Sequence, residues 1–373
     1  MAILKYFFRY FRTLYFSLLL ILSAMLTGCY EEFDPNIVST PVLCMNSLIT
    51  PGDSIKVNLS RTWRWNEVDP KIVITDADVS LFVNDEFKET MVCKLVTDNN
   101  DGYYEFDENG IYIYHKKTHY AYLADYIPKS GDRIRIEAHD KKYGDASAEV
   151  TVPYPVEIDA VETTMHNFRV YTNKFGPDTY GMDLDMLVWF TDPADTDNFF
   201  ELSYPKKQYS CSDYEGSDDL STEDSYYERV DVNYIDYSGE PLFTEHVSIL
   251  ESTITETFGY TIFTDRRIKG KSYPLHLKFE RVSYECYNPD KNPELGKVGI
   301  TVTLSHIDRS YYDHVLSVWQ ANDGIAGSLG SIGFGETVFA YSNVSTKAGV
   351  VTAAAPYTVK VPIRDLVLEK LEK

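Results

Sequence analysis

The sequence predicts a mainly β fold, because short stretches of alternating apolar and polar residues recur along most of the chain. The alternation is regular across residues 54–60 and 79–83, and turn-forming clusters such as 129–132 separate these stretches. A single segment, residues 308–321, has the spacing of an amphipathic helix. We therefore expect an N-terminal immunoglobulin-like β-sandwich, followed by a larger β-sandwich or barrel-like domain with one amphipathic helix.

Residues 42–153 are expected to form the first sandwich. The predicted strands there are residues 42–49, 54–60, 79–83, 91–96, 103–106, 111–114, 134–136 and 148–152. Asn84-Asp85 and the polar run 98–102 have the composition of hairpin turns. The segment Val152-Pro153-Tyr154-Pro155 marks the boundary, since two prolines at alternate positions interrupt sheet pairing.

Residues 154–373 are expected to form the second domain. Its clearest predicted strands are residues 182–191, 199–204, 275–279 and 298–304, with a long polar insertion at 209–225. In the predicted helix near 308–321, Ser310 and Asp313 have the spacing of a capping box, and Asn322-Asp323-Gly324 follows as a stop signal. This lone helix should pack across one end or face of the second sheet system.

The N-terminus has the layout of a secretory signal peptide. Lys5, Arg9 and Arg12 precede an apolar run from Leu14 to Leu26, which is short for a membrane span. Leu26-Thr27-Gly28-Cys29 resembles the lipobox of bacterial lipoproteins. The resemblance implies removal of residues 1–28 and acylation of Cys29, with palmitate among the chains. Residues 29–41 then form an acidic tether.

The net charge limits the kinds of partner. The chain has a formal charge of −22, and removal of the three leader cations makes the mature protein more negative still. Such a body repels phosphate backbones and anionic lipid surfaces, so nucleic-acid binding is not expected. Membrane attachment must come from the lipid on Cys29, because no second apolar stretch is long enough to span a bilayer.

The remaining cysteines allow disulfides. Cys44, Cys93, Cys211 and Cys286 could join in three ways, and an exported protein permits such bridges. Cys44 and Cys93 sit in apolar runs, where a bridge and buried thiols are equally compatible with the sequence. A bridge between Cys211 and Cys286 is favoured, because both lie in polar, tyrosine-rich surroundings. None of the four has the spacing of a zinc site.

Several motifs along the mature chain together resemble a known family. They are the lipobox, Phe33-Asp34-Pro35, the segment Asp192 to Tyr204, Tyr311-Tyr312, the glycine-rich Gly333-Phe334-Gly335-Glu336-Thr337-Val338, and Tyr341-Ser342-Asn343-Val344. In this order they are similar to the exported bacterial lipoproteins of domain-of-unknown-function family 4249. The resemblance covers nearly all of the mature chain.

The resemblance implies a role rather than a chemistry. Members of the family resemble accessory lipoproteins of TonB-dependent outer-membrane receptors in nutrient uptake, and they carry no established activity or catalytic residues. Glu31, Glu32 and Asp34 resemble the acidic signal that directs some lipoproteins to the cell surface. We therefore expect an outer-membrane lipoprotein that faces the outside, with the periplasmic face as the alternative.

The sequence contains no catalytic constellation, and we expect no cofactor. A nucleophile elbow is absent, and the eight histidines are scattered. Asp192, Asp195 and Asp197 are weak candidates for calcium ligands, although an Asp-Pro-x-x-Asp segment is commonly a turn.

Aromatic residues are the remaining signal for binding. Trp63, Trp65, Tyr226 and Tyr227 are candidates for contact with a ligand or partner, although aromatic residues also favour sheet interiors.

Three functions follow from these observations. The first is a non-catalytic accessory or ligand-binding module of a TonB-dependent nutrient-uptake system, anchored to the outer membrane by lipid. The second is a cell-surface hydrolase that acts on glycan or peptide. The third is a structural or adhesion protein of the envelope. The missing nucleophile and metal motifs favour the first.

Overall fold

The structure is a computed structural model. It describes residues 40–63, 67–68, 70–106, 112–174, 176–204, 207–211, 226–236, 239–243, 261–287, 296, 298–322 and 339–372. These residues are mostly strands in three sheets, with two helices among them, α3 (Arg309–Asn322) and α5 (Ile363–Leu371). The prediction of a mainly β fold is confirmed.

The largest sheet has eight strands. Their order is β14 (Ile262–Thr264), β11 (Phe199–Ser203), β16 (Gly299–Ile307), β17 (Gly349–Pro362), β1 (Leu43–Ile49), β2 (Lys56–Arg61), β6 (Tyr112–Leu123) and β5 (Val92–Phe106). The strands at the two ends of this order are not paired with each other, so the sheet is open.

Two smaller sheets complete the described fold. The five-stranded sheet has the order β12 (Lys207–Cys211), β13 (Tyr227–Asp236), β15 (Ser272–Tyr287), β10 (Thr179–Thr191) and β9 (Ile158–Tyr171). The four-stranded sheet has the order β4 (Glu86–Thr90), β3 (Asp78–Val83), β7 (Arg133–Asp140) and β8 (Gly144–Thr151). Both sheets are open in the described residues. For the second domain the prediction allowed a sandwich or a barrel-like arrangement, and the packing is that of a sandwich.

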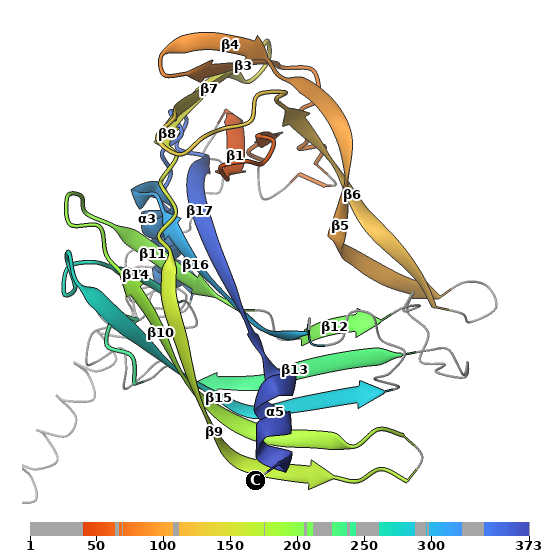
Figure 1. Cartoon of the computed structure of the whole chain (residues 1–373). Helices are drawn as coiled ribbons and strands as arrows, with labels where there is room; N and C mark the ends of the chain where they lie inside the picture. Colours follow the sequence, from red (N-terminus) through yellow and green to blue (C-terminus); the bar gives the residue numbers. More distant parts are fainter. Residues whose placement is uncertain are drawn as a thin grey trace, which may run out of the picture. The chain divides into compact units, whose positions relative to one another are not determined.

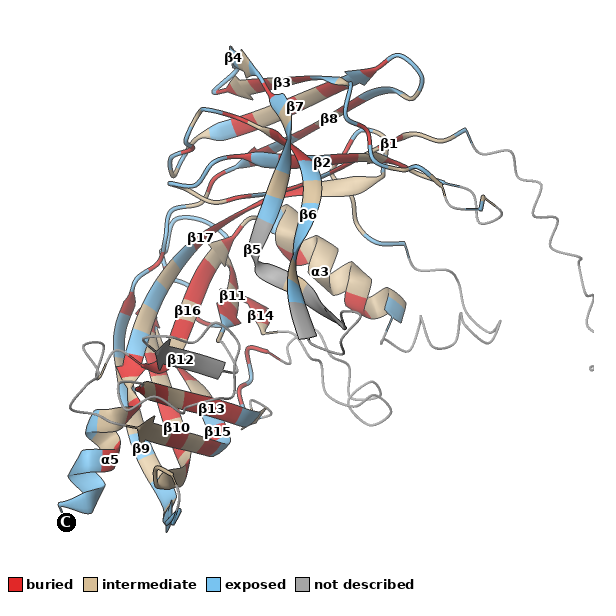
Figure 2. Cartoon of the chain, turned by 90° about the vertical axis from the view of Figure 1, so that its right-hand side faces the viewer, coloured by how far each residue is buried: buried red, intermediate tan, exposed pale blue. Residues whose placement is uncertain are grey.

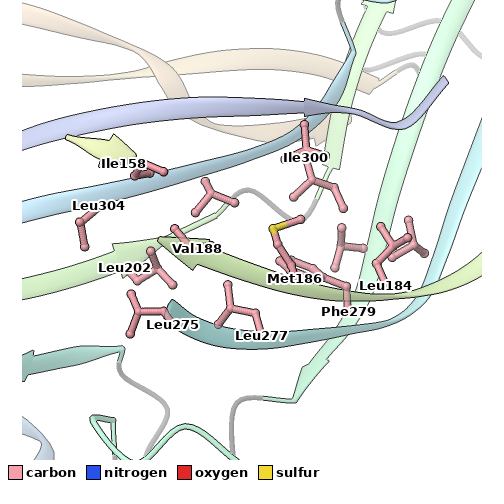
Figure 3. Packing of buried hydrophobic residues seen from close by; sticks show 14 of the residues in the cluster. Ile158, Leu184, Met186, Val188, Leu202, Leu275, Leu277, Phe279, Ile300 and Leu304 are labelled. Carbon is pink, nitrogen blue, oxygen red and sulfur yellow. The ribbon is translucent and has the colours of Figure 1, made fainter. Parts of the chain in front are cut away.

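Each smaller sheet packs against one part of the eight-stranded sheet. The first core joins β1 and β2 to β3, β7 and β8, with Leu43, Met45 and Ile136 fully buried between them. The second core joins β11 and β16 to β10, β13 and β15. Figure 3 shows Met186 and Val188 of β10 beside Leu277 and Phe279 of β15 in this second core.

Strict alternation explains why these sheets have one buried face. In β10, residues 182, 184, 186, 188 and 190 are buried, and the residues between them are partly exposed. Figure 2 shows the same banding of buried and exposed residues along many of the strands. Successive side chains in a strand point to opposite faces, so this pattern directs one face of the strand into the core.

The long strand β17 takes part in both cores. Its first residues, Gly349 to Ala353, pair in parallel with β1, and Ala354 to Pro362 pair antiparallel with β16. Val351 packs in the first core, whereas Val361 packs in the second. Figure 1 shows β17 running from the neighbourhood of β1 down toward α5. The predicted boundary near Pro153 lies between the two cores in sequence, and β17 crosses between them.

Helix α3 lies where the sequence places its helix and is held to the sheet by polar contacts. Asp308 caps its N-terminus by accepting hydrogen bonds from Ser310 N (2.7 Å) and Tyr311 N (3.4 Å). The same carboxylate accepts a bond from Ala353 N of β17 (2.7 Å). Trp319, which is almost fully buried, packs the apolar side of the helix against the end of the sheet.

Candidate ligand-binding site

The five-stranded sheet is irregular around Asp183 in β10. Its pairing with β15 shifts between Met182 and Leu184, and its pairing with β9 shifts between Gly181 and Asp183. Each neighbouring strand therefore carries one extra residue at this level, which is the definition of a β-bulge. Bulges are common beside functional sites because they redirect side chains.

Two residues in the bulges have a left-handed backbone. Asn167 in β9 has a φ of 51°, and Arg281 in β15 has a φ of 56°. For a residue with a side chain this conformation costs about 1–2 kcal/mol, and glycine adopts it without that cost. Asparagine tolerates this conformation better than most residues, so the cost falls mainly on Arg281.

Asp183 holds both bulges in place. Asn167 Nδ2 donates to Asp183 Oδ2 (2.7 Å), and Arg281 N donates to Asp183 Oδ1 (2.9 Å). The bond from Asn167, followed by the bond from the Arg281 backbone, lowers the pKa of Asp183 below its ordinary value. The carboxylate therefore stays ionised, and each of its oxygens already accepts a hydrogen bond.

The backbone of Arg281 is fixed on its other side as well. Asn233 Nδ2 in β13 donates to the carbonyl oxygen of Arg281 (2.9 Å). Together with the bond to Asp183, this contact restrains both peptide groups of Arg281. The direction in which the arginine side chain leaves the sheet is consequently set by the fold.

These residues line a surface pocket of about 550 Å³. Tyr171, 54% exposed, lies across Gly181, where a Cβ atom would come within 2.9 Å of the Tyr171 ring. The absence of a side chain at Gly181 is what lets the ring lie there. The remaining polar groups around the pocket come from Arg169, Asn233, Glu280 and Ser283.

The two arginines of the pocket differ from many other cations of the protein. Lys269 pairs with Asp197, Arg309 with Asp313 and Arg61 with Glu67. Within the described part of the chain, the guanidinium groups of Arg169 and Arg281 form no ion pair, although both line the pocket. The pocket therefore combines two arginines that form no ion pair among the described residues with the carboxylates of Asp183 and Glu280.

The sequence-predicted aromatic residues have different environments. Trp63 is 57% exposed, as a contact residue requires, and Trp65 lies outside the described residues. The prediction for Tyr226 is wrong, because this side chain is only 7% exposed.

Tyr227 packs within its sheet. Its ring stacks on Tyr287, with the ring centres 6.0 Å apart, and its hydroxyl donates to Glu285 (3.3 Å). Burial and this carboxylate raise its pKa to about 12.

The predicted disulfide between Cys211 and Cys286 is wrong in this structure. Cys286 is a free thiol in β15, and β13 lies between β15 and the strand that contains Cys211. Two inter-strand spacings separate the backbones by about 9–10 Å, which is beyond the reach of a disulfide. Burial raises the pKa of the Cys286 thiol. Cys44 and Cys93 are free thiols as well.

The three aspartates considered as calcium ligands do not converge. Asp192 is buried and accepts bonds from Asn198 Nδ2 (3.0 Å) and Gly270 N (2.7 Å), whereas Asp197 pairs with Lys269 (2.5 Å). Asp195 is exposed. No group of three metal-binding side chains occurs among the described residues. The segment is a turn that is held by Asn198.

The pocket around Asp183 was not predicted from the sequence. Its one local signal is a break in alternation, since Leu275, Leu277 and Phe279 are followed by Val282 rather than by an apolar residue at position 281. The predicted lipidation site, Cys29, lies outside the described residues. In the part that is described, no helix is long and apolar enough to cross a membrane.

The comparisons with known proteins identify a family. No curated protein and no solved structure matches the chain. One family model, described as a domain of unknown function (DUF4249), matches residues 30–358. This match spans most of the chain and confirms the resemblance seen in the sequence motifs. The chain therefore belongs to the DUF4249 family.

Proposed function

We propose that this protein is a lipid-anchored accessory lipoprotein of the outer membrane that binds a polar ligand beside a TonB-dependent nutrient receptor. The observation that carries the binding role is the pocket around Asp183, in which Asn167, Asp183 and the backbone of Arg281 are fixed by contacts within the sheet. Groups that are held in place by their neighbours lose little conformational entropy when a ligand binds.

The chemistry of the pocket favours binding over catalysis. Asp183 has a lowered pKa and both oxygens in use, so it is a poor general acid or base. Ser283 lines the pocket, but among the described residues no histidine lines it to activate that hydroxyl. This arrangement supports a binding module rather than a hydrolase.

Attachment to the membrane rests on Cys29. Replacing Cys29 with serine should prevent acylation, because the hydroxyl does not substitute for the thiol that carries the lipid. We expect the protein to move from the membrane fraction to the soluble fraction of the cell envelope. The measurement is fractionation combined with metabolic labelling by a fatty acid.

The matched control for this experiment is Cys44→Ser, which alters a free thiol in β1 and should leave both label and location unchanged. Retention of label by the Cys29→Ser variant would exclude acylation at Cys29. Protease treatment of intact cells distinguishes the two membrane faces, since only a protein on the outside is cleaved.

The accessory role predicts a stable partner. Affinity purification of the native lipoprotein in mild detergent should recover a TonB-dependent receptor in amounts comparable to the bait. An unrelated lipoprotein from the same membrane, tagged in the same way, should not recover it. Purification of the bait alone under conditions that preserve known membrane complexes would count against the accessory role.

A further inference from the structure

We propose that the pocket around Asp183 binds an oxyanion group of a small ligand, a carboxylate, sulfate or phosphate, through Arg169 and Arg281. Tyr171 then supplies a platform for the ring or apolar face of the same ligand. This inference rests on the proposed binding role and names the class of ligand.

The first argument is the state of the two arginines. Guanidinium groups bind oxyanions by paired, charge-assisted hydrogen bonds, which are stronger than bonds between neutral groups. Asp183 and Glu280 lie in the same pocket. The hydrogen bond from Asn167 and, more weakly, the charge of Arg169 lower the pKa of Asp183, but within the described residues neither arginine forms an ion pair with these carboxylates. The guanidinium groups therefore remain available to a ligand.

The second argument is the placement of the arginines. Arg169 pairs with Gly181 across β9 and β10, and Arg281 lies in the bulge on the opposite side of β10. The two side chains thus flank the same part of β10, where Gly181 contributes no side chain of its own. Tyr171 lines the same pocket and its ring lies close to Gly181, so a group bound between the arginines would be near this ring.

The third argument is the strained backbone of Arg281. Backbone strain in a folded protein persists where surrounding contacts enforce it, and it concentrates at binding sites. Here Asp183 and Asn233 enforce it from both sides of the residue. Glycine would remove the strain at φ 56° but would also remove the guanidinium, so an arginine here is explained by what its side chain binds.

The fourth argument is the platform. Tyr171 is more than half exposed and lines the pocket, so part of its ring is accessible to a ligand. Aromatic rings next to hydrogen-bonding groups are a common arrangement for ligands with one apolar and one polar side. Asn233 and Ser283 at the pocket add neutral polar groups for the rest of the ligand.

The test uses four matched probes, namely glucose, glucuronate, glucose 6-sulfate and glucose 6-phosphate, titrated into the purified full chain. Calorimetry and ligand-observed NMR measure binding. We expect at least one charged probe to bind tenfold or more tightly than glucose, and its affinity to fall as salt is raised. Which charged probe binds best distinguishes a carboxylate from a sulfate or phosphate ligand.

Two variants test the residues. Arg281→Gly and Arg169→Gln should each weaken binding of the charged probe at least tenfold. Arg281→Gly should keep or raise the melting temperature, because glycine relieves the left-handed backbone, so lost binding would not reflect lost folding. The control is Arg266→Gln, which removes an exposed arginine outside the pocket and should not change binding.

Equal binding of glucose and the charged probes would overturn the oxyanion assignment, as would full binding by Arg281→Gly or no binding of any probe. If no probe binds while the receptor is still recovered with the native lipoprotein, the inference fails and the proposed function stands. If charged probes bind but no receptor is recovered, the binding site stands and the accessory role fails.

Discussion

Replacing Gly349 with valine should destabilise the protein by about 4 kcal/mol, which combines the strain of a left-handed β-branched residue with a steric clash. Gly349 has a φ of 85°, and a Cβ atom there would lie 2.2 Å from the carbonyl oxygen of Met45. The contact is with backbone, so no side-chain rotation relieves it. The free energy of unfolding, measured by urea titration, tests the expectation.

The position of Gly349 makes the effect reach both cores. It begins β17 and pairs with Met45 of β1, so the clash separates the strand that connects the two cores from its parallel partner. Gly144→Val is the matched control, because Gly144 has a φ of 81° but a Cβ atom there meets nothing within 4 Å. The control should lose only about 1–2 kcal/mol from backbone strain. Equal losses in the two variants would show that close approach at Gly349 contributes nothing.

The alternating strands of the fold are predictable from local sequence, whereas β17 is not. Residues 182–191 alternate in the sequence and form β10 with the expected buried face. The first part of β17, with three successive alanines before Pro356, gives no alternation, and its partner β1 lies about three hundred residues away. Pairing between strands so far apart in the sequence depends on how both cores pack. A short stretch of sequence contains no information about that packing.

The same limit applies to the candidate site. Asn167, Asp183, Asn233 and Arg281 lie on four different strands and meet only because those strands pair in one register. The disulfide prediction failed for a related reason. Cys211 and Cys286 have similar polar neighbours in the sequence, but this similarity does not reveal that β13 lies between their strands. The predicted exposure of Tyr226 is wrong because its neighbours in the sequence are polar, although the side chain itself is buried.

The segment Asp192 to Tyr204, one of the motifs that carry the family resemblance, has a structural explanation in Asn198. This side chain is almost fully buried, and its Nδ2 donates to Asp192 Oδ1 (3.0 Å) and Asp265 Oδ2 (3.2 Å). It therefore bridges two buried carboxylates, each of which also accepts a backbone hydrogen bond, Asp192 from Gly270 N and Asp265 from Asn198 N. Asn198→Ala should destabilise the fold by about 2–3 kcal/mol, because it leaves each buried carboxylate with only its backbone donor.

The loss in the Asn198→Ala variant should depend on pH. Burial already raises the pKa of Asp192, and the bond from Asn198 opposes that rise, so the variant should raise the pKa further. The folded variant then holds a proton that the unfolded chain releases above about pH 3.9. Between the unfolded pKa and the raised folded pKa of Asp192, the folded state binds more protons than the unfolded state. The stability of the variant therefore falls as pH rises through this range. The destabilisation caused by Asn198→Ala should therefore be smaller near about pH 4 than at neutral pH.

Thr196→Val separates this electrostatic effect from a general disturbance of the turn. The Thr196 hydroxyl donates to Asn198 Oδ1 (2.7 Å) and orients the amide, but it contacts neither carboxylate in the described structure. Its removal from an exposed position should cost about 1 kcal/mol, with little dependence on pH. Urea titrations of both variants at neutral and acidic pH provide the measurement. A loss in Asn198→Ala that is the same at both pH values would mean that Asn198 acts by filling space, and that the buried carboxylates are stabilised by Gly270 and by the backbone of residue 198 instead.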